Sequence, residues 1–193
     1  SVTAIMFKNL GMDNGRAAQY SSLLILAYTV KPLFAPFVEM YRTKKFFVLC
    51  AQVLIGLGFA GAAMVMALPG YMLLLMPIFF ALSFVGATQD IASDGVYVTS
   101  LDSRAQSLYC GIQSLSWNIG PIVAAGGMVY LSGYLHTQVF GHDPQVFGPA
   151  WIDAWRIIFF LVAGLTLLMA AWHYRFMPEG ARAADTPAAV RGA

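Results

Sequence analysis

Charged residues are scarce in this chain. Asp, Glu, Lys and Arg make up 10% of its 193 residues, against roughly 25% in an ordinary soluble domain, whereas 59% of the residues are hydrophobic. A composition so poor in charge excludes a water-exposed surface over most of the chain and favours a polytopic membrane protein. A net charge of +2, without any basic stripe, also excludes a nucleic-acid partner.

Cysteine and histidine are equally sparse, with two and three residues. Cys50 and Cys110 lie in apolar runs far from any pair of histidines, so we expect neither a disulfide nor a zinc site. His136 and His142 share a loop with Asp143, a grouping that is more typical of a polar loop than of a metal site. The sequence therefore predicts no metal centre.

Enzyme motifs are missing as well. The chain has no nucleophile elbow, Walker loop, HExxH or CxxC motif. Asp90 and Asp94 are the only clustered carboxylates in an apolar segment, and membrane metal or phosphotransfer sites normally bring more acidic ligands than two. We therefore expect neither an enzyme nor a cofactor.

Long apolar runs dominate what is present. At 1.5 Å per residue, about 20 residues cross the roughly 30 Å hydrocarbon layer of a bilayer. The predicted complete spans are 17–38, 46–68, 71–99, 105–131 and 155–174, preceded by a partial span over about 1–10 and followed by a polar tail over 175–193. The expected fold is an all-α membrane protein, a six-helix bundle whose first helix is truncated.

Two of these spans carry residues that shape a helix bundle. Pro32 and Pro36 interrupt the first complete span, and prolines commonly bend a membrane helix. The next span contains small residues that let helix backbones approach each other closely. Three of them, Gly56, Gly58 and Gly61, are predicted to form a close-packing face.

Lysine and arginine are unevenly divided between the two ends of the predicted bundle. Seven of these residues gather at one end and three at the other, and the more basic end faces the cytoplasm under the positive-inside rule. The seven are Arg42, Lys44, Lys45, Arg104, Arg175, Arg182 and Arg191, and the three are Lys8, Arg16 and Arg156. We therefore expect a multi-pass membrane protein with a cytoplasmic C-terminal tail.

A polar stretch, Gly86 to Gly95, closes the otherwise uncharged run that begins at Tyr71. Its carboxylates, Asp90 and Asp94, are four residues apart and share one face of a helix. Ionisable groups in membrane helices usually face the bundle interior or a wet cavity. Lys31 has a similar predicted depth to Asp90, so we predict an ion pair that removes much of the desolvation penalty of either group alone.

Two interpretations of this pair stay open at the level of sequence. A carboxylate in a wet cavity is what a proton-coupled carrier needs, whereas the same pair could simply join two helices. Gln89, Gln113 and Asn118 are further candidates for contact with a substrate. Because Gln113 and Asn118 are five residues apart, about 140° of arc separates them on a helix, and packing hydrogen bonds explain them equally well.

Two motifs resemble those of a known family. The run Lys31-Pro32-Leu33-Phe34-Ala35-Pro36-Phe37-Val38-Glu39, followed by Arg42, Lys44 and Lys45, resembles the end of the second helix and the next loop in the major facilitator superfamily. Ala87-Thr88-Gln89-Asp90-Ile91-Ala92-Ser93-Asp94 is similar to the fourth-helix signature of one branch, the AmpG-type muropeptide permeases and acetyl-CoA transporters. The resemblance covers about residues 1–175. It implies the N-terminal half of a twelve-helix carrier whose two halves rock around a central site.

The resemblance also implies roles for the matching residues. Lys31 and Asp90 would occupy the central cavity and couple protons to the substrate. The cytoplasmic gate loop would comprise Glu39, Arg42, Lys44 and Lys45, with Asp94 beside it. The implied function is proton-coupled transport of a small solute, such as a muropeptide or a sugar conjugate, across the bacterial inner membrane by alternating access. Its partners would be protons, the lipid bilayer and the missing C-terminal half. The alternative is a non-transporting six-helix membrane module that serves assembly or sensing.

Overall fold

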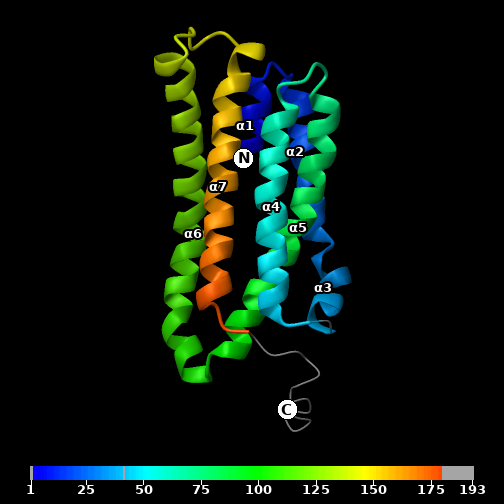
Figure 1. The fold of residues 1–193 in the computed structure, drawn as a ribbon, viewed down its shortest axis with the longest axis vertical. Helices are drawn as coiled ribbons and strands as arrows, with labels where there is room; N and C mark the ends of the chain where they lie inside the picture. Colours follow the sequence, from blue (N-terminus) through cyan, green and yellow to red (C-terminus); the bar gives the residue numbers. More distant parts are fainter. Residues whose placement is uncertain (1, 41, 180–193) are drawn as a thin grey trace.

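The structure, a computed structural model, describes residues 2–40 and 42–179, except for the side chains of Phe37, Glu39 and Met40. All regular elements in the described residues are helical, and most of them run along the long axis of the molecule (Figure 1). The helices are α1 (Val2–Asn9), α2 (Asn14–Thr29), α3 (Lys31–Met40), α4 (Lys44–Val65), α5 (Met72–Ser100), α6 (Ser103–Tyr134) and α7 (Ile152–Phe176). The connection between α6 and α7 holds a π-helical turn, η1 (Leu135–Val139), and a 3-10 turn, η2 (Pro149–Trp151).

Among the described helices, three are long and apolar enough to cross a membrane. They are Lys44–Val65, Met72–Ser100 and Pro149–Phe176, the last including η2. These segments correspond to the predicted spans 46–68, 71–99 and 155–174. The predicted span 105–131 is also one helix, α6, but its polar residues keep it outside this group. The described part of the chain is therefore all-helical, and it contains three candidate membrane-spanning segments.

The predicted span 17–38 is divided into α2 and α3 at Val30. Pro32 has no N–H group, so it cannot donate to the carbonyl of Tyr28 as a helical residue would. The Val30 N–H instead lies against the carbonyl oxygens of Leu26 and Tyr28 and closes α2. Lys31, which precedes the proline and is disfavoured in a continuing helix, becomes the first residue of α3. Pro32 therefore breaks the span rather than merely bending it, whereas Pro36 lies inside α3.

Helix α4 packs between α5 and α7 (Figure 1). A Cβ atom at Gly56 would lie 2.7 Å from Leu167 Cγ of α7, and one at Gly58 would lie 2.4 Å from Leu82 Cδ2 of α5. Residues two positions apart on a helix point about 200° apart, so these glycines serve opposite faces. No described atom lies within 4 Å of a Cβ built at Gly61. The prediction of a single close-packing face formed by all three glycines is therefore wrong.

Aromatic rings join the same three helices. Phe59 of α4, Phe79 of α5 and Phe159 of α7 have ring centroids 5.6 to 6.4 Å apart, within the range of favourable tilted and edge-to-face pairs. Trp155 of α7, whose side chain is fully buried, lies beside Phe159. Phe7 of α1 extends the cluster to the N-terminal helix through its contact with Phe79. The core therefore lies nearer the end of the bundle where α1 and α2 meet.

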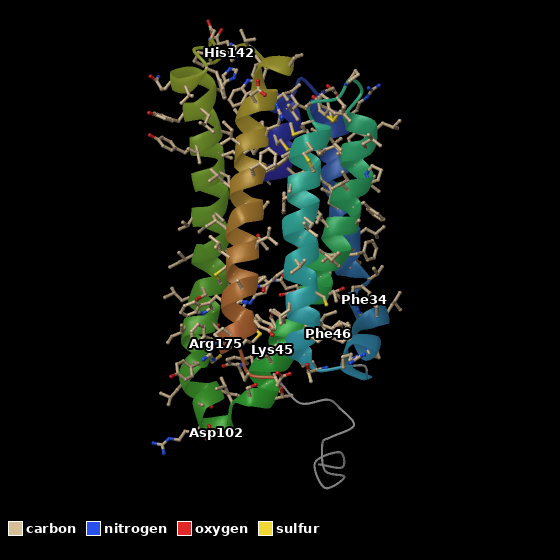
Figure 2. All side chains as sticks on the ribbon, viewed as in Figure 1. Phe34, Lys45, Phe46, Asp102, His142 and Arg175 are labelled. Atoms are coloured by element: carbon tan, nitrogen blue, oxygen red, sulfur yellow. The ribbon has the colours of Figure 1, made fainter. Side chains whose placement is uncertain are left out.

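The connections gather at two ends of the bundle. The α3–α4 and α5–α6 connections lie at one end together with the end of α7, and the α1–α2, α4–α5 and α6–α7 connections lie at the other (Figure 1). Figure 2 shows Lys45, Asp102 and Arg175 toward the first end and His142 at the second. The predicted grouping of basic segments is confirmed for the described part, and residues 180–193 of the tail lie outside it.

We expect Gly56→Val to lower the midpoint of thermal unfolding in detergent, because the new side chain would collide with Leu167 and approach the Ala163 carbonyl oxygen, 3.3 Å from a Cβ. Overpacking costs about 1–3 kcal/mol, or roughly 2–12 °C for a chain of this length. Gly61→Val makes the same chemical change in open space and is the matched control. Equal losses for the two variants would contradict the packing described here.

Candidate functional site

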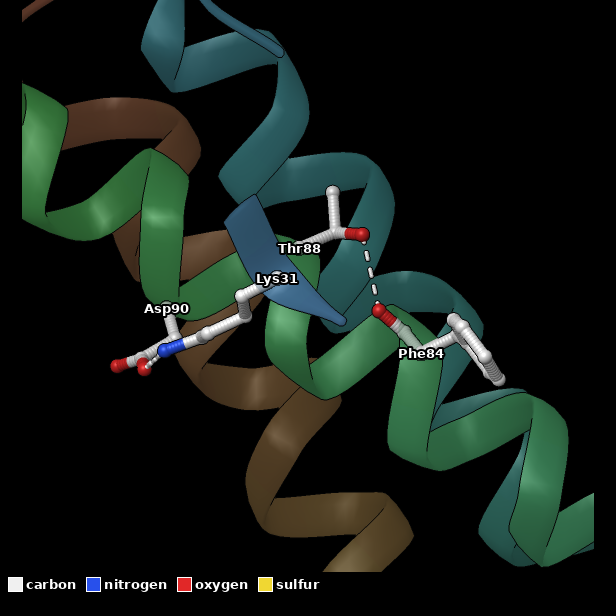
Figure 3. A network of polar contacts seen from close by, with 4 residues as sticks. All are labelled: Lys31, Phe84, Thr88 and Asp90. Carbon is white, nitrogen blue, oxygen red and sulfur yellow. Dashed lines mark hydrogen bonds and ion pairs between the residues drawn. The ribbon is translucent and has the colours of Figure 1, made fainter. Parts of the chain in front are cut away.

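The site is centred on an ion pair between two helices. Lys31 Nζ at the start of α3 donates to Asp90 Oδ2 of α5 (Figure 3). The two side chains are 26% and 19% exposed, so both are largely withdrawn from the surface. The contact predicted from the depths of these residues is therefore present. Each charge lowers the cost of burying the other.

The break in the helix explains why Lys31 needs this partner. The N-terminus of a helix carries partial positive charge, so a lysine in the first turn is at the unfavourable end. In α3 the lysine is the first helical residue, and it forms its ion pair with Asp90. The carboxylate therefore offsets both the repulsion from the helix end and the desolvation of the ammonium.

Tyr28 is a member of the site that sequence reasoning missed. The Lys31 ammonium lies 5.4 Å from the centroid of the Tyr28 ring, in a cation–π contact. The Tyr28 hydroxyl lies 2.9 Å from the position of a Cβ built on Gly86. Any side chain at Gly86 would displace the phenol, so this glycine makes room for the ring that supports Lys31.

Gly95, at the other end of the polar stretch, leaves room for the Lys44 side chain. The Lys44 side chain is 4% exposed, and its Cδ lies 3.0 Å from a Cβ built on Gly95. Its ammonium donates to the Val38 carbonyl oxygen at 3.3 Å, near the end of α3. Lys44 therefore connects α3, α4 and α5. It is the buried first residue of α4, where the sequence predicts a gate loop.

The other predicted residues of α5 and α6 take no direct part in the ion pair. Asp94, one turn beyond Asp90, is exposed and forms no ion pair within the described part of the chain. Gln89 is partly exposed on α5. Gln113 and Asn118 lie on α6, which packs on α1 and α7, and the Asn118 amide donates to the Ser114 carbonyl of its own helix at 2.7 Å. The structure does not bring these two amides to Lys31.

The other predicted gate residues lie around the turn into α4. Arg42 has a φ of 55°, in the left-handed region, and its guanidinium lies 5.6 Å from the Phe46 ring centroid. The backbone N–H of Lys45 donates to the Glu179 carbonyl oxygen at 3.1 Å, and its ammonium lies 3.7 Å from the Glu179 carboxylate. The turn is therefore joined to the segment that follows α7. The side chain of Glu39 lies outside the described residues.

An apolar cavity of about 350 Å³ begins beside the ion pair. Tyr28 and Gly86 form part of its wall, and Thr3 and Ser83 contribute hydroxyl groups. The Ser83 hydroxyl donates to the Phe79 carbonyl oxygen of its own helix at 2.9 Å. One phenol therefore borders both the charged pair and the cavity, and this arrangement suits a solute that has an apolar part and a charged group.

Sequence reasoning also missed a polar contact between two of the candidate membrane-spanning helices. Gln52 of α4 is buried, and its Nε2 lies 2.8 Å from Nδ1 of His173 in α7. Hydropathy marks both residues as polar interruptions, but their registers on separate helices give no signal that they meet. This contact fastens α4 to α7 and lies on the opposite side of α4 from α5, where the ion pair is.

Within the described residues, no cluster of three or more His, Cys, Asp or Glu side chains could hold a metal ion. Comparisons with protein-family models, curated proteins and solved structures found no significant match to the chain. The chemistry of the site therefore follows from its own residues. These provide one ammonium, one carboxylate and one phenol at the edge of an apolar cavity.

We expect Lys31→Ala to destabilise the folded bundle more than the double change Lys31→Ala/Asp90→Asn, because the single change leaves a partly buried carboxylate without its cation. The difference should be about 0.5–3 kcal/mol, the usual range for coupled neighbours. It can be measured from unfolding midpoints in detergent.

Lys45→Ala is the matched control. Its contact with Glu179 is long and involves a carboxylate that is 70% exposed, and such pairs contribute roughly 0–1 kcal/mol. Identical stabilities for Lys31→Ala and the double variant would show that the ion pair makes no contribution.

Proposed function

We propose that this chain is the N-terminal half of a secondary active transporter of the major facilitator type, in the branch of the muropeptide permeases and acetyl-CoA transporters. In this proposal Lys31 and Asp90 couple proton movement to the movement of a small solute. The observation that carries it is an ion pair between two helices of a mostly apolar bundle. Ionisable groups at such positions usually mark the path of an ion or a substrate.

The order of the helices supports the proposal. If α2 and α3 form one broken membrane helix, then this helix and α4 to α7 provide five successive passes, and the 8-residue α1 corresponds to the partial span that precedes them. Broken helices are common at the binding sites of secondary transporters, because non-helical backbone is tolerated where it lines a cavity. The break at Val30 lies directly before Lys31, which is where such a carrier would need it.

The ion pair suggests how a proton and a solute would travel together. A carboxylate or phosphate on the solute competes with Asp90 for the Lys31 ammonium. Once released from the ammonium, the Asp90 carboxylate is disfavoured as an anion in its partly buried surroundings and takes up a proton. The site then holds the same total charge as before, so the two halves can rock around it without moving an unpaired charge through an apolar region.

The proposed solute is a small anionic amphiphile such as a muropeptide or another sugar conjugate. Lys31 would hold its anionic group, and the apolar cavity lined by Tyr28 and Gly86 would take its less polar part. The proposed family branch places the protein in the bacterial inner membrane, and the positive-inside rule places the more basic end of the bundle in the cytoplasm. Arg42 and Lys45 would then face the C-terminal half at the cytoplasmic gate.

We expect Asp90→Asn to abolish proton-driven uptake, because the amide cannot take up and release the coupled proton. The full carrier is reconstituted in vesicles, an inward proton gradient is imposed, and uptake of a radiolabelled muropeptide is measured. Exchange of external for internal muropeptide without a gradient should persist, since Lys31 can still bind the anion. Asp94→Asn, which alters the exposed neighbouring carboxylate, is the matched control and should retain gradient-driven uptake.

Normal gradient-driven uptake by Asp90→Asn would refute Asp90 as the coupling group. Loss of both uptake and exchange from a correctly folded variant would assign Asp90 to solute binding instead. If the unmodified carrier neither takes up nor exchanges any solute from a panel of anionic sugar conjugates, the transport proposal itself fails. A module for assembly or sensing would then be the better interpretation.

A further inference from the structure

His136 occupies an unusual position at the opposite end of the bundle from the gate loop. It lies in η1, directly after α6, and its side chain is fully buried. The imidazole stacks on the indole of Trp151 in η2, with centroids 3.9 Å apart and planes inclined by 10°. The ring thus joins the end of α6 to the beginning of α7.

Both nitrogens of the His136 ring face backbone acceptors. Nδ1 lies 3.2 Å from the carbonyl oxygen of Ala150, and Nε2 lies 3.1 Å from that of Asp143. A neutral imidazole has only one N–H group, so it can donate to one carbonyl and must present a lone pair to the other. The imidazolium form donates to both. The local geometry therefore matches the protonated ring better than either neutral tautomer.

We propose that His136 is a proton-operated clasp that holds the α6–α7 connection closed while its imidazole is protonated. The clasp comprises His136, the carbonyl groups of Asp143 and Ala150, and the ring of Trp151. Two charge-assisted hydrogen bonds and an aromatic face stabilise the cation. Loss of the proton turns one attractive contact into repulsion between two lone pairs, which loosens the connection.

Among the described charged groups near the clasp, none replaces the two carbonyl groups as hydrogen-bond partner of the His136 ring. The nearest titratable ring, that of His142, lies 5.1 Å from His136 between centroids and would oppose a second positive charge. The Asp143 carboxylate accepts from the Gln145 N–H at 2.8 Å. In α7, Asp153 and Arg156 pair with each other, and on α1 the side chain of Lys8 is exposed. In the described structure no carboxylate is hydrogen-bonded to the His136 ring.

The clasp is linked to the rest of this end of the bundle. The Trp151 indole N–H donates to the Val146 carbonyl oxygen at 2.7 Å, and the Gly148 N–H donates to the Asn9 carbonyl oxygen of α1, also at 2.7 Å. Gly148 has a φ of 96°, which a residue with a side chain rarely adopts. Opening the clasp would therefore loosen contacts among α1, α6 and α7. This role is independent of the proposed transport function.

The test is ¹⁵N NMR of the full chain in detergent micelles with ¹⁵N-labelled histidine, using His142→Gln and His136→Gln to assign the signals. At pH 5.5 we expect both ring nitrogens of His136 to carry protons. Thermal unfolding is measured over the same pH range.

Histidines change charge between about pH 5 and 8, and the clasp opens when the ring loses its proton, so the unfolding midpoint should fall further across this range in the unmodified chain than in His136→Gln. His142→Gln should keep the pH dependence. A single neutral tautomer of His136 at every pH from 5 to 8 would overturn the proposal. If His136→Gln does not fold, the NMR titration of the unmodified chain and of His142→Gln still decides the matter.

Discussion

The contact between the Lys31 ammonium and the Asp90 carboxylate is the constraint around which α2, α3 and α5 are arranged. Each charge lowers the cost of burying the other among so many apolar side chains. The break at Val30 presents Lys31 to α5, and two glycines admit the side chains that pack around α5. Gly86 leaves room for Tyr28 beside the ammonium, and Gly95 leaves room for the stem of Lys44.

A tightly packed frame holds this arrangement. In it, α4 packs between α5 and α7, with Gly56 and Gly58 allowing close approach on opposite faces and with phenylalanine rings joining the three helices. The segment that carries Lys31 is attached differently, because α3 packs mainly on α5 and is separated from α2 by a break. Asp90 therefore lies on the packed frame and Lys31 on the segment beyond the break, a division that the proposed alternating access would use.

Much of the fold could be predicted from the sequence, because hydropathy and length report which segments leave water. The depth of Lys31 and Asp90 along their helices even predicted the contact between them. The position of the break could not be predicted, since Pro32 and Pro36 both allow one and the choice depends on where the freed carbonyl finds a donor. The pairing of Gln52 with His173 and the stacking of His136 on Trp151 depend on the relative rotation of separate helices, which a single sequence does not contain.

The central claim is that Lys31 keeps Asp90 ionised and that Asp90 takes up a proton when this cation is removed. Infrared spectroscopy of the reconstituted protein at pH 7 tests it directly through the C=O stretching band of a protonated carboxyl group. The unmodified protein should show no such band from Asp90. Lys31→Gln should show one, and it should vanish in Lys31→Gln/Asp90→Asn. An Asp90 that stays ionised in Lys31→Gln would contradict the account.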